Sequence, residues 1–196
     1  MTAAVTFKSW IFAALILLAS PRLFAATNIF PIMPWNTPPN DPAVLKRIKE
    51  CGFTIAGFVP PSGLDLCEAA GLKAIVSDRR TSDYDWDNVD EPTARKRVES
   101  LVAEVGKHPA VFGYNLRDEP PVSYFAGLNK VASAVREFAP GKWPYINLFP
   151  DYAENWQLGA TNYAEYLERF IQACKPKIVS YDNYSIFEDG SMRGSY

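Results

Sequence analysis

Short apolar segments alternate with amphipathic segments along most of the chain. The apolar segments have the length of strands and lie at Ile29–Trp35, Phe53–Val59, Leu72–Ser77, Val111–Leu116, Pro144–Phe149 and Lys177–Tyr184. The amphipathic segments repeat apolar residues at helical spacing and lie at Pro42–Cys51, Leu64–Ala70, Pro92–Gly106, Ser123–Phe138 and Asn162–Cys174. This pattern predicts six strands and five helices, with Asp41 and Ser123 as helix caps and a polar loop at Asp78–Val89.

Strands that alternate with helices indicate βαβ units and therefore a parallel sheet. Uninterrupted apolar strands such as Phe53–Val59 favour a sheet that is buried on both faces. Neither GxGxxG nor GxxxxGK[ST] follows the first predicted strand, so dinucleotide-binding and P-loop folds have no support. Polar residues instead follow nearly every predicted strand, which is typical of a TIM barrel.

The predicted number of strands is too small for a whole barrel. A (β/α) barrel has eight strands and about 250 residues, whereas this chain of 196 residues has six predicted strands. We therefore expect an α/β fold in which a parallel TIM barrel is truncated after about six strands. Residues 27–196 would form this partial catalytic domain, and no linker or second domain is visible.

The first 26 residues have the pattern of a signal peptide. Lys8 supplies the positive charge, Trp10–Ala19 is an uncharged apolar run, and Leu23–Ala26 offers small residues for cleavage. The run is shorter than the roughly 20 apolar residues that span a membrane. We expect a secreted or periplasmic protein without membrane contact after cleavage, and an uncleaved N-terminal anchor is the alternative.

Composition narrows the classes of partner. The formal net charge is −2, from 20 basic and 22 acidic residues, so nucleic acid is not an expected partner. Hydrophobic residues at 48% and charged residues at 21% exclude a disordered chain. Aromatic residues make up 14%, a content that suits a surface for a neutral ligand such as a carbohydrate. The oligomeric state stays open.

Neither the cysteines nor the histidine form a recognisable metal or disulfide motif. Export permits disulfides, and a Cys51–Cys67 pair is one interpretation, but we favour small buried residues for Cys51, Cys67 and Cys174 alike. The single His108 precedes the fourth predicted strand, at the barrel end opposite the expected site. Without CxxC or HExxH, no metal or other cofactor is expected.

The clearest chemical motif is a strand that runs into two adjacent carboxylates. The strand Val111–Leu116 is followed by Arg117 and then by Asp118-Glu119-Pro120. Pro120 disfavours helical backbone at Glu119 and ends the strand there, so both carboxylates lie at the rim of the predicted barrel. A solvated turn ahead of the next helix is the alternative interpretation.

This motif resembles strand four of the clan A TIM-barrel glycoside hydrolases, a retaining superfamily that includes β-galactosidases and cellulases. Strand four of that clan typically ends in Asn-Glu-Pro, and this chain has Asp118-Glu119-Pro120 after Phe112-Gly113-Tyr114. The resemblance covers the βα order from Ile29 to Tyr184. It implies a glycosidase that cleaves a β-linked glycan, with Glu119 as the general acid/base.

The resemblance leaves two positions unmatched. The clan's nucleophile is a Glu that ends strand seven, and this chain has no such strand, so the nucleophile is missing. Asp118 stands where the clan has an Asn that donates a hydrogen bond to the sugar, and an ionised Asp can only accept. Either the contact with the sugar is inverted, or Asp118 pairs with Arg117 or another base.

Residues at other predicted strand ends are candidates for carbohydrate binding. Together with Asp118 we expect the following residues to line one cleft: Trp35, Asn36, Asp78, Asn147, Tyr181 and Asp182. Tyr84 and Trp86 either form a wall of this cleft or fold down onto the barrel. Asn183-Tyr184-Ser185 also matches the short glycosylation pattern.

Two functional classes fit these observations. The first is a secreted retaining glycoside hydrolase, and the second is a non-catalytic carbohydrate-binding barrel or inactive fragment, in which Asp118 in place of Asn marks lost chemistry. A hydrolase or lyase of other esters or anionic sugars has neither a Ser–His pair nor a metal cluster to support it.

Overall fold

The computed structural model describes residues 30–193, which fold into five strands and seven α-helices. The strands are β1 (Ile55–Val59), β2 (Lys73–Val76), β3 (Val111–Asp118), β4 (Trp143–Leu148) and β5 (Ser180–Tyr181). The helices are α1 (Pro42–Glu50), α2 (Leu64–Ala69), α3 (Arg79–Ser82), α4 (Glu91–Val105), α5 (Phe125–Phe138), α6 (Asn155–Leu158) and α7 (Tyr163–Cys174), with 3₁₀ turns at Pro61–Gly63 and Val122–Tyr124. The predicted signal peptide at 1–26 lies outside the described residues.

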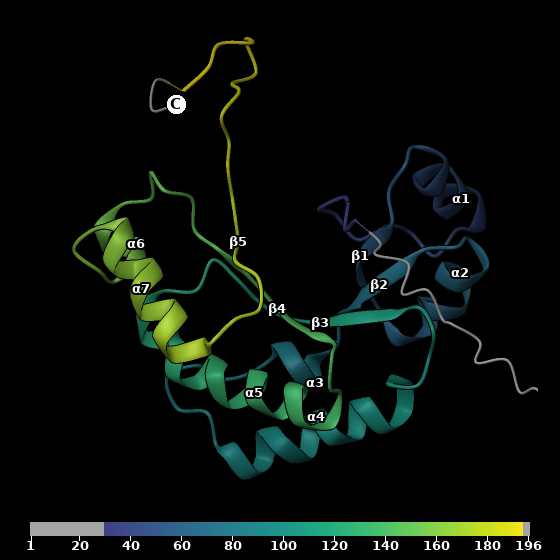
Figure 1. The fold of residues 1–196 in the computed structure, drawn as a ribbon, viewed down its shortest axis with the longest axis horizontal. Coiled ribbons are helices and arrows are strands. Elements are labelled where there is room, and N and C mark those ends of the chain that lie inside the picture. Colours follow the sequence, from purple (N-terminus) through teal and green to yellow (C-terminus); the bar gives the residue numbers. More distant parts are fainter. Residues whose placement is uncertain (1–29, 194–196) are drawn as a thin grey trace, which may run out of the picture.

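The sheet is wound in one direction only. Its strands pair in the order β1-β2-β3-β4-β5, and every pair is parallel. Helices α4, α5 and α7 lie on one side of the strands, and β5 continues into the C-terminal segment on the other side (Figure 1). A doubly wound sheet would reverse its strand order and carry helices on both faces. The fold is therefore a parallel half-barrel, and the predicted truncated barrel is confirmed.

The two faces of the sheet have cores of very different size. The large core lies between the strands and the helices, and Val76, Tyr114 and Leu148 contribute to it from three strands. The small core lies apart from it and consists of Ile55, Ile75 and Tyr145, with Met33, Phe58 and Phe112 packed around them. The buried residues of both cores are nearly inaccessible to water, so the face without helices also has a small core of its own.

Polar caps decide where the main helices begin. The Asp41 side chain accepts from the backbone N–H groups of Ala43 and Val44 at 2.7 and 3.3 Å, and Pro42 occupies the first turn of α1. Asn162 caps α7 in the same way through Glu165. Ser123 does not cap α5 as predicted, because it lies within a 3₁₀ turn that leads into the helix.

The first predicted strand, Ile29–Trp35, is wrong over its described part, residues 30–35. Pro31 and Pro34 have no N–H for a ladder, and the segment is irregular. It is nevertheless tied to the start of β1, because Thr54 N donates to Ile32 O at 2.9 Å and Ile32 N donates to Thr54 Oγ1 at 2.9 Å. The described chain consequently has five strands instead of six.

The last predicted strand is also shorter than expected. Of Lys177–Tyr184 only Ser180 and Tyr181 pair as β5, with Asn147 and Leu148 of β4. The predicted loop at Asp78–Val89 contains the short helix α3, which Asp78 caps through the backbone N–H of Arg80. Part of the expected loop is therefore helical, because Asp78 caps a helix soon after the strand ends.

The cysteines are free thiols in the structure. Cys67 and Cys174 are buried, as predicted, but Cys51 is exposed, which corrects the expectation that all three are buried. Cys51 follows the last residue of α1, where the chain leaves the core. None of the helices among residues 30–193 has the length and apolar character needed to cross a membrane.

Tyr84 and Trp86 fold down onto the domain. Trp86 is 4% exposed in the large core, and its ring packs 5.2 Å from that of Tyr84. The chain at Trp86 passes so close to α5 that a Cβ on Gly127 would lie 2.2 Å from the backbone oxygen of Trp86. Glycine at position 127 is thus what allows this loop to lie against the helix.

We predict that Gly127→Ala destabilises the fold by about 1–3 kcal/mol, the usual cost of overpacking against groups that move little. Urea denaturation of the purified chain measures this change as a lower midpoint. Ala126→Ser, which adds one heavy atom at an exposed position of the same helix, is the matched control. Equal stability of the two variants would contradict the close approach of Trp86 to α5.

Candidate functional site

The ends of β3, β4 and β5 bring three carboxyl groups and one amide together. Asp118 is the last residue of β3 and pairs with Asn147 of β4, while Asp182 follows β5 directly. Glu119 comes next after β3 in the left-handed backbone region, with φ of 43°. Its backbone N–H still donates to Asn147 O at 2.8 Å, so the turn is held to the sheet.

Asn147 connects two of the carboxylates. Its Nδ2 donates to Asp118 Oδ1 at 3.0 Å and to Asp182 Oδ1 at 2.8 Å. The residue is 2% exposed, although it lies at a strand end. Both amide protons are used within the protein, so Asn147 has no free N–H for a ligand.

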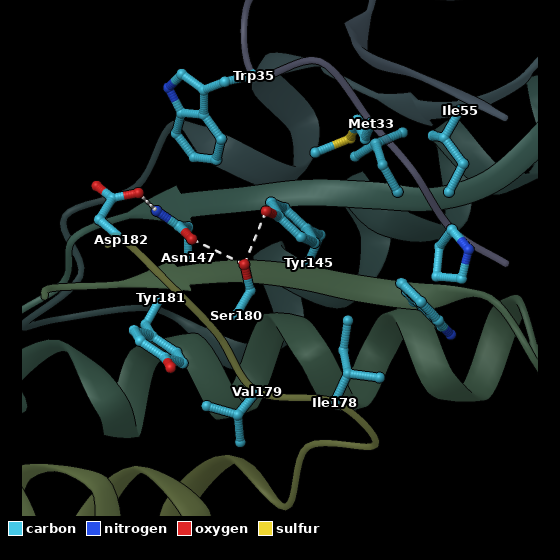
Figure 2. A pocket seen from close by; sticks show the side chains of 13 residues that line it. Met33, Trp35, Ile55, Tyr145, Asn147, Ile178, Val179, Ser180, Tyr181 and Asp182 are labelled. Carbon is cyan, nitrogen blue, oxygen red and sulfur yellow. Dashed lines mark hydrogen bonds between the residues drawn. The ribbon is translucent and has the colours of Figure 1, made fainter. Parts of the chain in front are cut away.

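A second set of hydrogen bonds fixes the orientation of this amide. Ser180 Oγ donates to Asn147 Oδ1 at 2.8 Å and lies 2.9 Å from the hydroxyl of Tyr145. A hydroxyl has one proton, and that of Ser180 is used toward Asn147, so Tyr145 donates to Ser180. Figure 2 shows this chain of contacts from Tyr145 through Ser180 and Asn147 to Asp182.

The carboxyl group of Glu119 has a strongly raised pKa. Burial, a hydrogen bond to the Asp182 side chain and the charges of Asp182 and Asp118 raise the pKa of Glu119 to about 7. The carboxyl group of Glu119 thus lies within hydrogen-bonding reach of Asp182. A carboxyl with this pKa holds a proton close to neutral pH, which is the state that a general acid requires.

Asp118 does not pair with its neighbour Arg117. Burial raises the pKa of Asp118, while the hydrogen bond from Asn147 lowers it. The guanidinium of Arg117 lies over the ring of Tyr124, 5.7 Å from its centre. The amide of Asn147 is thus the hydrogen-bond partner of Asp118, and Arg117 acts on Asp118 through its charge, which lowers the pKa.

An open hollow of about 510 Å³ adjoins the cluster on the face of the sheet without helices. Its polar end is formed by Asn147, Ser180 and Asp182, and Trp35 and Tyr181 lie beside that end (Figure 2). Trp35 is 40% exposed and rests edge-on against Phe58, with ring centres 5.0 Å apart. The rest of the lining is mostly apolar and includes Met33, Ile55, Ile75, Trp143 and Tyr145.

The predicted site residues divide into three groups. The hollow brings together Trp35, Asn147, Tyr181 and Asp182, while Asp118 and Glu119 join it through their contacts with Asn147 and Asp182. Asn36 is exposed and does not line the hollow.

Asp78 has a different role from the one predicted. It binds Arg80 at 2.9 Å, and Arg80 in turn binds Glu104 at 2.8 Å. The guanidinium of Arg80 lowers the pKa of Asp78. Asp78 is therefore a structural cap and ion-pair partner that joins α3 to α4.

The sequence analysis did not identify Tyr145 and Ser180 as site residues, whereas Tyr184 was a candidate at the end of the last predicted strand. The hydroxyl of Tyr184 lies 3.5 Å from Asp182 Oδ2, and the charge of Asp182 raises the pKa of Tyr184. Tyr145 and Asn147 are two positions apart on β4, so they point to the same face. That alternation in the sequence was a usable signal for Tyr145. The position of Ser180 follows only from the pairing of β5 with β4, which the sequence pattern does not give.

A second group of potential ligands lies at the opposite end of the sheet. His108 Nε2 lies 3.0 Å from Asp65 and 3.5 Å from Glu68. His108 Nδ1 accepts from the backbone N–H of Ala110 at 3.1 Å, so the ring proton of the neutral imidazole is on Nε2. That proton occupies the position a metal would need, and the group fits a histidine held by two carboxylates better than a metal site.

We predict that the carboxyl of Glu119 makes the folded chain less stable as pH rises. The folded pKa of about 7 lies above the unfolded value of about 4.3, so the folded state binds more protons between these values. This contribution to stability is present below pH 4.3 and is lost as pH rises through 7. Solvent screening of the half-exposed side chain reduces the effect to about 1 kcal/mol.

Urea denaturation at pH 5 and pH 8 measures this effect against Glu119→Gln, which cannot ionise. Wild type should lose stability relative to Glu119→Gln between the two pH values. The matched control is Glu188→Gln, at an exposed position of the C-terminal segment, and it should follow wild type. A constant difference between wild type and Glu119→Gln would contradict the raised pKa.

Comparison with known proteins gives similarity of fold to glycoside hydrolases. An endo-1,4-β-mannanase from Eisenia fetida has a TM-score of 0.49 at 12% identity, over 76% of this chain and 63% of its own. A β-galactosidase from the psychrophilic Marinomonas ef1 has a TM-score of 0.47 at 11% identity, over 72% of this chain and 38% of its own. An endoglucanase from Pseudomonas stutzeri, solved with cellobiose, has 0.46 at 16% identity, over 77% and 53%.

These similarities concern the fold and part of each larger structure. The chain spans from 38% to 63% of the length of these three proteins. No protein-family model matches the sequence, and no curated protein matches it either.

Proposed function

We propose that this chain is the N-terminal part of a secreted, retaining glycoside hydrolase that acts on a β-linked glycan. The observation that carries the proposal is the position and protonation of Glu119. Its carboxyl lies at a strand end beside an open hollow, and its pKa is raised to about 7. A protonated carboxyl at such a position can protonate the oxygen of a leaving sugar.

The neighbouring acids suit Glu119 to both halves of a retaining reaction. In the first step Glu119 gives its proton to the glycosidic oxygen as the bond to the sugar breaks. In the second step the ionised Glu119 takes a proton from the water that releases the sugar. A pKa near neutrality allows both directions of transfer, and the charges of Asp118 and Asp182 support it.

The nucleophile of this proposal lies outside the described residues. Retaining glycosidases place their two carboxyl groups about 5–5.5 Å apart. Asp182 contributes to the raised pKa of Glu119 through a hydrogen bond and through its charge. We assign Asp182 to the environment of the acid and expect the nucleophile from a further strand of the barrel.

The hollow offers the surfaces that a sugar ring needs. Exposed faces of Trp35 and Tyr181 supply aromatic area, and the carboxylates of Asp118 and Asp182 accept hydrogen bonds from hydroxyl groups. The guanidinium of Arg117 lies over the ring of Tyr124, and its charge lowers the pKa of Asp118 only as one of the smaller contributions. This combination favours a neutral carbohydrate over an anionic one.

A carbohydrate-binding barrel without catalysis is the second candidate. The observation that favours it is Asp118, which accepts a hydrogen bond from Asn147 instead of presenting an amide donor to a ligand. Such a protein would keep the hollow and the aromatic residues and would bind the same glycans. Binding and turnover therefore have to be measured separately.

We predict that the chain binds neutral β-linked oligosaccharides through the hollow and that Trp35→Ala weakens binding about tenfold, as expected for one lost aromatic stack. Isothermal titration with a panel of mannan-, cellulose- and galactan-derived oligosaccharides measures the affinities. Trp156→Ala is the matched control, since Trp156 is 81% exposed on α6 and does not line the hollow. Equal losses in both variants, or no binding to any glycan, would refute the assignment.

We further predict that Glu119→Gln in the whole gene product abolishes turnover of natural glycans. Activated aryl glycosides should lose less in the first step, because their leaving groups need no proton. The 196-residue chain alone should show no turnover. Undiminished hydrolysis of natural glycans by Glu119→Gln would exclude Glu119 as the acid, and turnover by the chain alone would reveal a second carboxylate within it.

A further inference from the structure

We infer that Phe58 is a positioning residue that holds the ring of Trp35 in place as an aromatic wall of the hollow. Trp35 lines the hollow, whereas Phe58 is not among its lining residues and acts only through its neighbour. This role rests on the proposed function, in which the hollow takes a neutral glycan. It names the residue and the backbone irregularity that direct one aromatic ring toward that glycan.

A β-bulge near the end of β1 changes the direction of the Phe58 side chain. Ala56 lies opposite Ala74 of β2. Val59 lies opposite Val76, so β1 contains one residue more than β2 between the two pairs. The side chains of a regular strand alternate between the two faces, which would direct Phe58 to the same face as Ala56.

The two cores show that the bulge reverses this direction. Ala56 and Val59 belong to the large core on the side of the helices. Phe58 packs instead against the small core, which contains Ile55 and lies on the face without helices. The extra residue therefore turns the ring of Phe58 to the face on which the hollow lies.

Phe58 has this orientation in a backbone conformation that bulky side chains rarely adopt. Its φ is 58°, in the left-handed region, where the Cβ atom crowds the backbone and glycine is favoured. Strained backbone of this kind is concentrated at binding and catalytic sites. Its occurrence beside the hollow points to a role for the ring, since a glycine at this position would relieve the strain.

The ring of Phe58 contacts two residues that line the hollow. Trp35 meets it edge-on, with ring centres 5.0 Å apart and ring planes at 84°. The ring centre of Tyr145 lies 6.1 Å away, with the planes at 50°. Both distances lie in the range over which aromatic pairs attract each other. Phe58 thus joins Trp35, in an irregular segment, to Tyr145 in the regular strand β4.

The residue before Phe58 brings the backbone next to Trp35 into range. A Cβ on Gly57 would lie 2.7 Å from Pro34 O and 3.3 Å from Met33 Cγ. The lack of a side chain at Gly57 therefore lets this segment lie against β1. Trp35 is 40% exposed, and the ring of Phe58 gives its indole a fixed orientation.

The first measurement follows the mobility of the Trp35 indole by ¹⁵N relaxation in the full chain, and it needs no sugar. The signal lost in Trp35→Phe identifies this indole among the five tryptophans. In wild type its order parameter should be near about 0.85, the value of rigid groups. Phe58→Leu removes the ring and should lower the order parameter below about 0.6. Phe58→Tyr keeps the ring and should retain the wild-type value.

Phe58→Gly is the second variant, and it decides the outcome if Phe58→Leu does not fold. Glycine adopts the left-handed backbone without strain, and its lack of a ring should release Trp35 in the same way. Phe112→Leu is the matched control, since Phe112 packs against the same small core and meets Trp143 edge-on at 4.5 Å. This change should leave the order parameter of Trp35 as in wild type.

The second measurement is the binding of cellohexaose and mannohexaose by isothermal titration. Phe58→Leu should weaken binding about three- to tenfold, because the aromatic wall is no longer held in place. In a chain that already carries Trp35→Ala, the same change should have no further effect, because the ring that Phe58 positions is absent. A merely structural role of Phe58 would weaken binding in both backgrounds.

Three results would overturn this role of Phe58. The first is a mobile Trp35 indole in wild type, and the second is an indole that stays immobile in Phe58→Leu or, where that variant does not fold, in Phe58→Gly. The third is an equal loss of affinity with and without the Trp35 ring. The proposed function is judged independently. If Phe58 controls the mobility of Trp35 but neither oligosaccharide binds, carbohydrate binding is rejected and the positioning of Trp35 stands.

Discussion

The parallel pairing of β3 with β4 is the constraint on which the site depends. Their register places Asp118 opposite Asn147, and one step further the backbone of Glu119 donates to Asn147 O. Parallel strands all end at the same edge of a sheet. Asp182 directly follows β5, which pairs with β4, and therefore lies at the same edge as Asp118 and Asn147. Three acids from two separate parts of the sequence therefore meet because the sheet is regular up to its edge.

The same edge also holds the backbone in an unfavourable conformation. Glu119 has a positive φ and precedes Pro120, a combination that costs of order 1–3 kcal/mol. The hydrogen bond to Asn147 O and the buried position of Pro120 offset this cost. A glycine would relieve the strain, but it would have no carboxyl group. Strain and a raised pKa thus occur at one residue, a combination that is common at functional sites.

The sequence was sufficient for the fold class because periodicity and alternation reflect burial directly. The apolar positions of α4, α5 and α7 and of β2 to β4 follow from that signal. It failed at residues 30–35, where an apolar run contains two prolines that remove ladder donors, and at Ser123, where a 3₁₀ turn replaced the cap. Strand ends also suggested Glu119 and Asp182, but not Tyr145 and Ser180, whose roles depend on which strands are neighbours. Asp78 shows the converse error, since a strand-end carboxylate can equally cap the helix that follows it.

The irregular segment at residues 30–35 contributes to both the small core and the hollow, although it does not pair as a strand. Met33 packs against Ile55 and Ile75 on the sheet face that has no helices, and Pro34 O approaches so closely that only glycine fits at position 57. This segment and the ring of Phe58 cover part of that face, while Trp35 stays partly exposed beside the hollow. Met33 and Trp35 are two positions apart, a spacing that directs both side chains to the same face of an extended segment even without ladder pairing. Met33 thus contributes to the small core, while Trp35 forms part of the wall of the hollow.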